Sequence, residues 1–256
     1  MIKELVLNNI RTDSWSLPLL APYFLEAAKK KVRLSDIENC DLIAKVFSHN
    51  IQYHISDSVV TELSGDDKSN YLRLISKSGS FAKFDETELV QLKDLLKFSE
   101  IDSKVCKILS DQLIFSGFLR LNEVNFKTAS HPHFYGIIIL SELFFKQSIE
   151  SKYISVCHEL GHHELFLINT TDRLVVNEYE NHKVFVQLQN TERPPMARLH
   201  SLFALDKMIS AAKRIRSLEL EKFETMIIQN LETFNEIELT EFGNKVVTVL
   251  KEKHGM

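Results

Sequence analysis

The sequence predicts an α+β fold that is predominantly α-helical, with one small β-sheet packed beside a buried helix. Glycine and proline are rare among the 256 residues, at 7 and 5, which favours helices over a turn-rich β-sandwich or barrel. Most of the chain carries apolar residues at helical spacing. The run at 134–140 is the clearest strand, because it is short, apolar and preceded by a polar loop.

The N-terminal part of the chain, residues 1–130, predicts mostly helices. Apolar side chains recur at helical spacing over 17–50, and the following stretch, 51–63, is β-branched enough for a strand. A polar loop over 64–70 separates these segments from the next elements. We expect this part, which holds the single tryptophan, Trp15, to contribute to a substrate groove.

A helix that ends at Phe98 is expected next. Asp85 suits its N-cap position, and Glu88, three residues on, completes a capping box. A further helix over 103–115 and a strand over 118–126 follow. This strand and the apolar run named above would form the small sheet.

The C-terminal part, 131–256, predicts four more helices. They span 147–168, 196–217, 219–234 and 240–253. A mostly polar stretch, 169–193, follows the first of them. Pro194 and Pro195 open the second, where proline is tolerated in the first turn, and Thr240 suits the N-cap of the last. With no repeat and no flexible linker, one domain over 1–256 is expected.

Charge and cysteine usage exclude several classes of protein. The formal net charge of −4 gives no electrostatic reason to expect a nucleic acid or an anionic membrane as partner. No stretch of about 18 apolar residues predicts a membrane span, and the N-terminus shows no secretory signal. Cys40, Cys106 and Cys157 are too scattered for a disulfide framework and suit the reducing cytoplasm. The sequence does not decide between a monomer and a homodimer.

The most informative motif is His158-Glu159-Leu160-Gly161-His162, on the helix expected over 147–168. Histidines four apart on a helix lie on one face, with Cβ atoms about 5–6 Å apart. One divalent metal can bind a nitrogen from each of them. Apolar residues cover most other sides of this helix, so we expect the metal site to be buried.

A catalytic metal usually has three protein ligands and one open position, so the chain must supply a third ligand. Ile168 stands where metzincin-like peptidases have a third histidine, which excludes that class. Three acidic residues downstream are alternatives: Asp172, Glu178 and Glu180. His200 is the better candidate, because it lies on an expected helix whose core face includes Leu199 and Phe203. A set of three histidines suits Zn or Fe(II). The side chain of Cys157 points about 100° around the helix from that of His158, so Cys157 is expected in the core.

The ordered series of this pentapeptide, then Arg193-Pro194, then Leu199-His200 with Phe203, resembles the HExxH-type α-ketoglutarate-dependent peptide β-hydroxylases. These Fe(II) dioxygenases are associated with ribosomally synthesised, modified peptides. The resemblance spans 134–250 and includes the stretch 239–243, but it is weak over the first 130 residues. Two features depart from the family pattern. A Pro-Trp-containing segment before Arg193 is absent, and Ser201 stands where glycine is expected.

The resemblance implies that His158, His162 and His200 hold Fe(II). α-Ketoglutarate would chelate the metal, and a cation would bind its distal carboxylate. Arginine suits that role because its planar fork binds carboxylate through two hydrogen bonds. Arg193 matches the family's Arg-Pro pair and is the first choice, and Arg198 is the second.

Glu159 separates two chemistries. In a zinc metallopeptidase it would be the general base that activates metal-bound water. In an oxygenase it would orient a ligand or contact the substrate. The sequence favours an oxygenase that hydroxylates a β-carbon in a peptide, with the zinc peptidase as the alternative. A binding or maturation protein without a catalytic metal is the third hypothesis.

Overall fold

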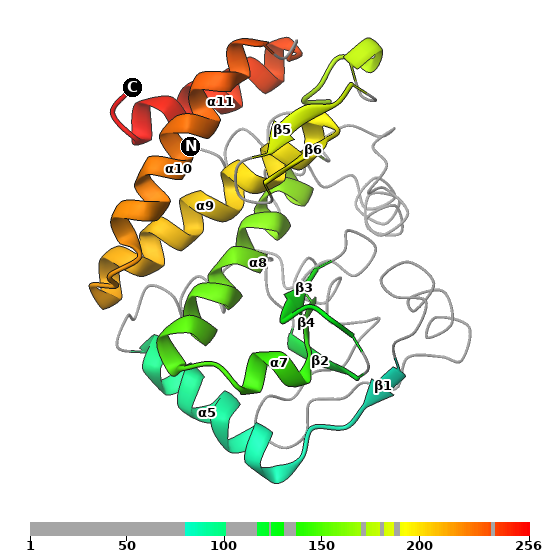
Figure 1. The fold of residues 1–256 in the computed structure, drawn as a ribbon, viewed down its shortest axis with the longest axis vertical. Helices are drawn as coiled ribbons and strands as arrows, with labels where there is room; N and C mark the ends of the chain where they lie inside the picture. The colour runs from blue at the N-terminus through cyan, green and yellow to red at the C-terminus, as the bar shows by residue number, and fades with distance from the viewer. Residues whose placement is uncertain are drawn as a thin grey trace, which may run out of the picture. The chain divides into compact units, whose positions relative to one another are not determined.

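The computed structural model describes residues 80–100, 117–122, 124–130, 137–169, 173–179, 182–186, 190–236 and 239–256. The chain divides into two compact units, whose boundary lies between Glu159 and Leu160, and each unit is described by itself. The α+β class is confirmed, because helices predominate and the strands form two small sheets (Figure 1). The single domain stays a prediction.

Several sequence-based expectations lie outside the described residues. They are Trp15, the helices over 17–50 and 103–115, the strand over 51–63 and the loop over 64–70. The substrate groove expected from the N-terminal part is untested for the same reason.

The first unit contains a four-stranded mixed sheet. Its strands are β1 (Ser80–Ala82), β2 (Gly117–Asn122), β3 (Thr128–Ala129) and β4 (Ile137–Leu140). They lie in the order β1-β2-β4-β3, in which β2 and β4 are parallel and the other two pairs are antiparallel. Ile138, Ile139 and Leu140 are fully buried, as the apolar run predicted.

The strand expected over 118–126 is shorter in the structure, since β2 ends at Asn122. Beyond it, Val124 and Phe126 lie outside any strand and pack against the buried pair Leu121 and Ile139. Their burial explains why this stretch has the composition of a strand without pairing as one.

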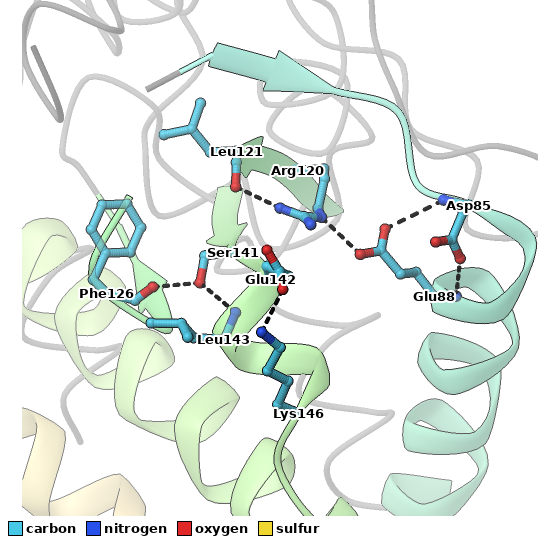
Figure 2. A network of polar contacts seen from close by, with 9 residues as sticks. All are labelled: Asp85, Glu88, Arg120, Leu121, Phe126, Ser141, Glu142, Leu143 and Lys146. Carbon is cyan, nitrogen blue, oxygen red and sulfur yellow. Dashed lines mark hydrogen bonds and ion pairs between the residues drawn. The ribbon is translucent and has the colours of Figure 1, made fainter. Parts of the chain in front are cut away.

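Helix α5 (Glu86–Glu100) begins with the expected capping box (Figure 2). The main-chain N–H of Glu88 donates to Asp85 Oδ1 at 2.7 Å, and that of Asp85 donates to Glu88 Oε2 at 3.3 Å. The other oxygen of Glu88 accepts from Arg120 Nε at 2.9 Å, and both of these side chains are buried. Because Arg120 lies on β2, this ion pair joins the start of α5 to the sheet.

Ser141 links β4 to the short helix α7 (Glu142–Phe145). Its hydroxyl accepts from the N–H of Leu143 at 3.1 Å and donates to the carbonyl of Phe126 (Figure 2). Its own N–H donates to the carbonyl of Lys127 at 3.0 Å. The loop before β3 is therefore held against the end of β4.

Helix α8 (Ile149–Asn169) carries the histidine motif. It begins two residues later than expected because Ser148 caps it, accepting from the N–H of Ser151 at 3.2 Å. Its apolar stripe is buried at Tyr153, Val156 and Leu160, which confirms the expectation of a largely covered helix. Among the helices that the structure describes, none is long and apolar enough to cross a membrane.

The second unit contains three long helices after the end of α8. They are α9 (Pro195–Ile215), α10 (Leu220–Glu232) and α11 (Glu241–Lys253). All three match the expected helices within a few residues, and α10 packs against α9 (Figure 1). The polar stretch before α9 holds the 3₁₀ turn Asn177–Tyr179 and a hairpin of β5 (Val184–Val186) and β6 (Thr191–Arg193). The sequence did not predict this hairpin.

Thr240 caps α11, as expected, by accepting from the N–H of Gly243 at 3.0 Å. Its hydroxyl also donates to the carbonyl of Arg173, and its N–H donates to that of Leu174 at 3.1 Å. A Cβ on Gly243 would lie 2.1 Å from the Leu174 oxygen, so only glycine fits this contact. The stretch 239–243 thus fixes the segment at 173–174.

Candidate metal centre

The structure brings His162 of α8 and His200 of α9 together. Their Nδ1 atoms lie 3.1 Å apart, and their ring centroids are separated by 5.0 Å at an interplanar angle of 58°. Phe166, one turn after His162, meets the His200 ring at a centroid distance of 5.3 Å. Both histidines are half-buried. A pair of nitrogens is therefore held between the two helices.

Gly161 explains why the helices approach closely enough for this contact. A Cβ at Gly161 would lie 2.4 Å from the Phe203 carbonyl oxygen and 2.8 Å from the Ala204 Cα. Real Cβ atoms are not found at such distances from main-chain atoms, so α8 and α9 pack here main chain against main chain. Because Gly161 precedes His162, and Phe203 lies about one turn after His200, this contact aligns the two rings.

The donor atoms of this pair suit a metal ion. Neutral imidazole is a common metal ligand through either ring nitrogen. Two nitrogens bound to one tetrahedral metal at 2.0–2.1 Å would be about 3.3 Å apart, close to the distance in the structure. Without a metal, one imidazole can donate an N–H to the other. The His162–His200 pair therefore fits both the metal-bound form and the metal-free form.

His158 lies one turn before His162 on α8 and is half-buried, but it belongs to the first unit. Within the ranges that the structure describes, no group of three or more histidine, cysteine, aspartate or glutamate side chains is arranged to hold a metal ion. The role of His158 as a further ligand stays a prediction.

Glu159 is bound to strand β3 and the residue after it. Thr128 Oγ1 donates to its Oε1 at 2.7 Å, and Ser130 Oγ donates to its Oε2 at 2.6 Å. The side chain is almost completely buried, at 3% exposure, so these hydroxyls satisfy a charge that water barely reaches. Sequence reasoning missed both hydroxyl residues.

Arg198 and Arg193, the two candidates for the α-ketoglutarate carboxylate, have different surroundings. Arg198 is buried, donating to the carbonyl of Phe185 from Nε at 2.9 Å and Nη2 at 2.5 Å, and to that of Thr233 from Nη1 at 3.1 Å. Arg193 is exposed at the end of β6, and within the described part of the chain its guanidinium makes no hydrogen bond or ion pair. Arg193 is therefore better placed to bind a ligand. Both assignments stay predictions.

The remaining candidates are weaker. Glu178 is exposed on the 3₁₀ turn, while Asp172 and Glu180 lie outside the described residues. Cys157 is buried, as expected for a core residue. Searches against protein-family models and against curated proteins find no match to this sequence.

Proposed function

We propose that this chain is an Fe(II)- and α-ketoglutarate-dependent oxygenase that hydroxylates a β-carbon in a ribosomally synthesised peptide. Its iron ligands are His158, His162 and His200. The contact between the last two is the observation that supports the proposal most strongly. The motif and the helix positions predict these two histidines as joint ligands, and the 3.1 Å between their Nδ1 atoms supports a shared metal.

The surrounding residues have defined tasks in this proposal. Bound Fe(II) with α-ketoglutarate supplies the oxidation of a C–H bond by O₂. The Phe166 ring meets the His200 ring edge to face and restrains the orientation of the imidazole. Arg193 provides an exposed planar fork for the distal carboxylate of α-ketoglutarate.

The surroundings of Glu159 support the oxygenase over the zinc peptidase. A hydrolytic base must accept a proton from water at the metal. Each oxygen of Glu159 instead accepts a hydrogen bond, one from Thr128 on β3 and the other from Ser130 directly after that strand. These bonds give the carboxylate a structural task, anchoring α8 to the edge of the sheet.

The remaining parts of the proposal follow from composition. The partner is a peptide, and the net charge of −4 gives no reason to add a nucleic acid or an anionic membrane. The three scattered cysteines favour a reducing compartment, so we place the protein in the cytoplasm.

Two assays on one preparation test this function. The chain is incubated in air with Fe(II) and α-ketoglutarate while succinate is measured, and separately with Zn and casein while cleavage is measured. We expect succinate from the wild type and from Glu159→Gln, with casein intact. Casein cleavage that disappears in Glu159→Gln and is indifferent to α-ketoglutarate would establish the peptidase instead.

A further inference from the structure

We infer that Arg198 is a positioning residue: it clamps the β5–β6 hairpin to α9 and thereby holds Arg193 in place for α-ketoglutarate. This inference rests on the proposed function of Arg193. It replaces the expectation that Arg198 itself binds the cosubstrate. The guanidinium of Arg198 already donates to two main-chain carbonyls, of Phe185 and Thr233.

Arg198 attaches the hairpin through β5. Phe185 is the central residue of β5, and its carbonyl accepts from both Nε and Nη2 of Arg198. This forked contact restrains the strand in distance and in orientation, as a single donor would not. The contact is made by main chain, because the Phe185 side chain is 41% exposed and does not anchor the strand by burial.

The register of the hairpin places Arg193 next to this attachment. Phe185 pairs with Glu192, and its neighbour Val184 pairs with Arg193. Arg193 therefore pairs one position along β5 from Phe185, the residue whose carbonyl Arg198 holds. It also directly precedes Pro194, the N-cap of α9. Both ends of the short strand β6 are therefore constrained, one through pairing with β5 and the other through the start of α9.

Arg198 also contacts the residues at the end of α10. Nη1 of Arg198 donates to the carbonyl of Thr233, at the end of α10, and its Cζ lies 6.0 Å from the centre of the Phe234 ring. Arg198 is 2% exposed, so its charge is satisfied inside the protein. Since His200 lies two residues later on α9, the Arg198 side chain links the helix that carries this proposed metal ligand to the hairpin that carries Arg193.

The experiment uses the full chain with four substitutions: Arg198→Met, Arg198→Lys, Arg193→Gln and the double variant Arg193→Gln/Arg198→Met. Lys222→Met, an exposed cation on α10, is the control. Hydrogen–deuterium exchange of peptides covering 184–193 is measured without metal. KM for α-ketoglutarate and kcat are measured with Fe(II). Circular dichroism confirms folding, and Arg198→Lys carries the test if Arg198→Met does not fold.

We expect exchange over 184–193 to rise about 10-fold or more in Arg198→Met, less in Arg198→Lys, and not in Lys222→Met. KM should rise by a similar factor in Arg198→Met while kcat changes little. The double variant should have the KM of Arg193→Gln alone, because Arg198 acts through Arg193.

Unchanged exchange in both Arg198 variants would overturn the clamp. Additive KM effects in the double variant would show that Arg198 contacts the cosubstrate itself, and would also overturn it. If the wild type consumes no α-ketoglutarate, the proposed function fails, whereas the exchange measurement still decides whether the hairpin is clamped.

Discussion

Nδ1 of His162 and Nδ1 of His200 lie 3.1 Å apart although 38 residues separate them along the chain. The contact exists because α8 and α9 meet at Gly161, where a side chain of any size would push them apart. The fourth position of the pentapeptide motif therefore has a structural task beside the metal-binding role that we propose for its histidines.

Replacing His200 by alanine is expected to weaken binding of Fe(II) or Zn. Loss of a direct ligand should cost more than the roughly 10–100-fold that follows loss of a residue supporting a ligand. Isothermal titration with each metal measures the change. His182→Ala, at an exposed position of the same unit, is the matched control and should bind as the wild type does. Equal metal affinities of His200→Ala and His182→Ala would show that His200 is not a metal ligand.

Gly161→Ala is expected to lower both stability and metal affinity. Alanine favours a helix by about 1 kcal/mol over glycine, but its Cβ would clash with main-chain atoms of Phe203 and Ala204, and overpacking of this kind costs about 1–3 kcal/mol. Urea denaturation and metal titration measure the two effects. Gly255→Ala adds a methyl group in open space at a φ of +77°, so it strains the main chain without a clash and should leave metal affinity unchanged. A Gly161→Ala protein that binds metal normally would contradict this helix contact.

Removing the two hydroxyls that hold Glu159 should destabilise the fold strongly. The double variant Thr128→Val/Ser130→Ala leaves a buried carboxylate without these donors, which is expected to cost about 3–5 kcal/mol. The free energy of unfolding from urea titration checks this value. The exposed Thr225→Val on α10 should change it by less than about 0.5 kcal/mol. A comparably small loss in the double variant would mean that Glu159 does not depend on these bonds.

The carboxylate of Asp206 makes stability depend on acid pH. Burial acts to raise its pKa, but the hydrogen bond with His254 and the charges of Lys253 and Lys207 outweigh burial, so the pKa is lowered. His254 Nε2 lies 2.9 Å from Oδ1, and Lys253 Nζ lies 2.7 Å from Oδ2. Because the folded pKa lies below the unfolded value of about 3.9, the stabilisation is present above that pH and is lost as the pH falls through the folded pKa.

Asp206→Asn should therefore lose about 1–3 kcal/mol at pH 7, and this loss relative to the wild type should be smaller near pH 3. Urea unfolding at the two pH values measures this. The exposed pair Lys213–Glu224 provides the control, since Glu224→Gln should cost no more than about 1 kcal/mol. A difference between Asp206→Asn and the wild type that is the same at both pH values would exclude this origin of the acid sensitivity.

Local signals in the sequence predicted much of the described fold. The capping box of Asp85 and Glu88, the cap at Thr240 and the proline start of α9 involve contacts within a few residues, which sequence reasoning captures well. The β5–β6 hairpin was missed, because its strands are three residues long and one of them carries mostly polar residues. Such short strands depend on tertiary anchors like Arg198 that leave no periodic signal.

For the candidate site too, the sequence predicted the residues on strongly patterned helices but not the contacts between distant segments. The placement of His200 with His162 followed from motif spacing and the apolar face around Leu199, because both histidines lie on strongly patterned helices. The roles of Thr128, Ser130 and Arg198 did not follow. Each depends on a contact between side chains or carbonyls from distant segments, and nothing in the local sequence marks it.

The most direct test of the metal proposal is an anaerobic titration of metal-free protein with Fe(II) and then α-ketoglutarate, followed by visible absorption. We expect a charge-transfer band that saturates at one Fe(II) and one α-ketoglutarate per chain in the wild type. We expect no such band in His200→Ala, whereas His182→Ala should retain it. Absence of the band in the wild type, together with tight retention of zinc, would contradict the oxygenase and favour the peptidase.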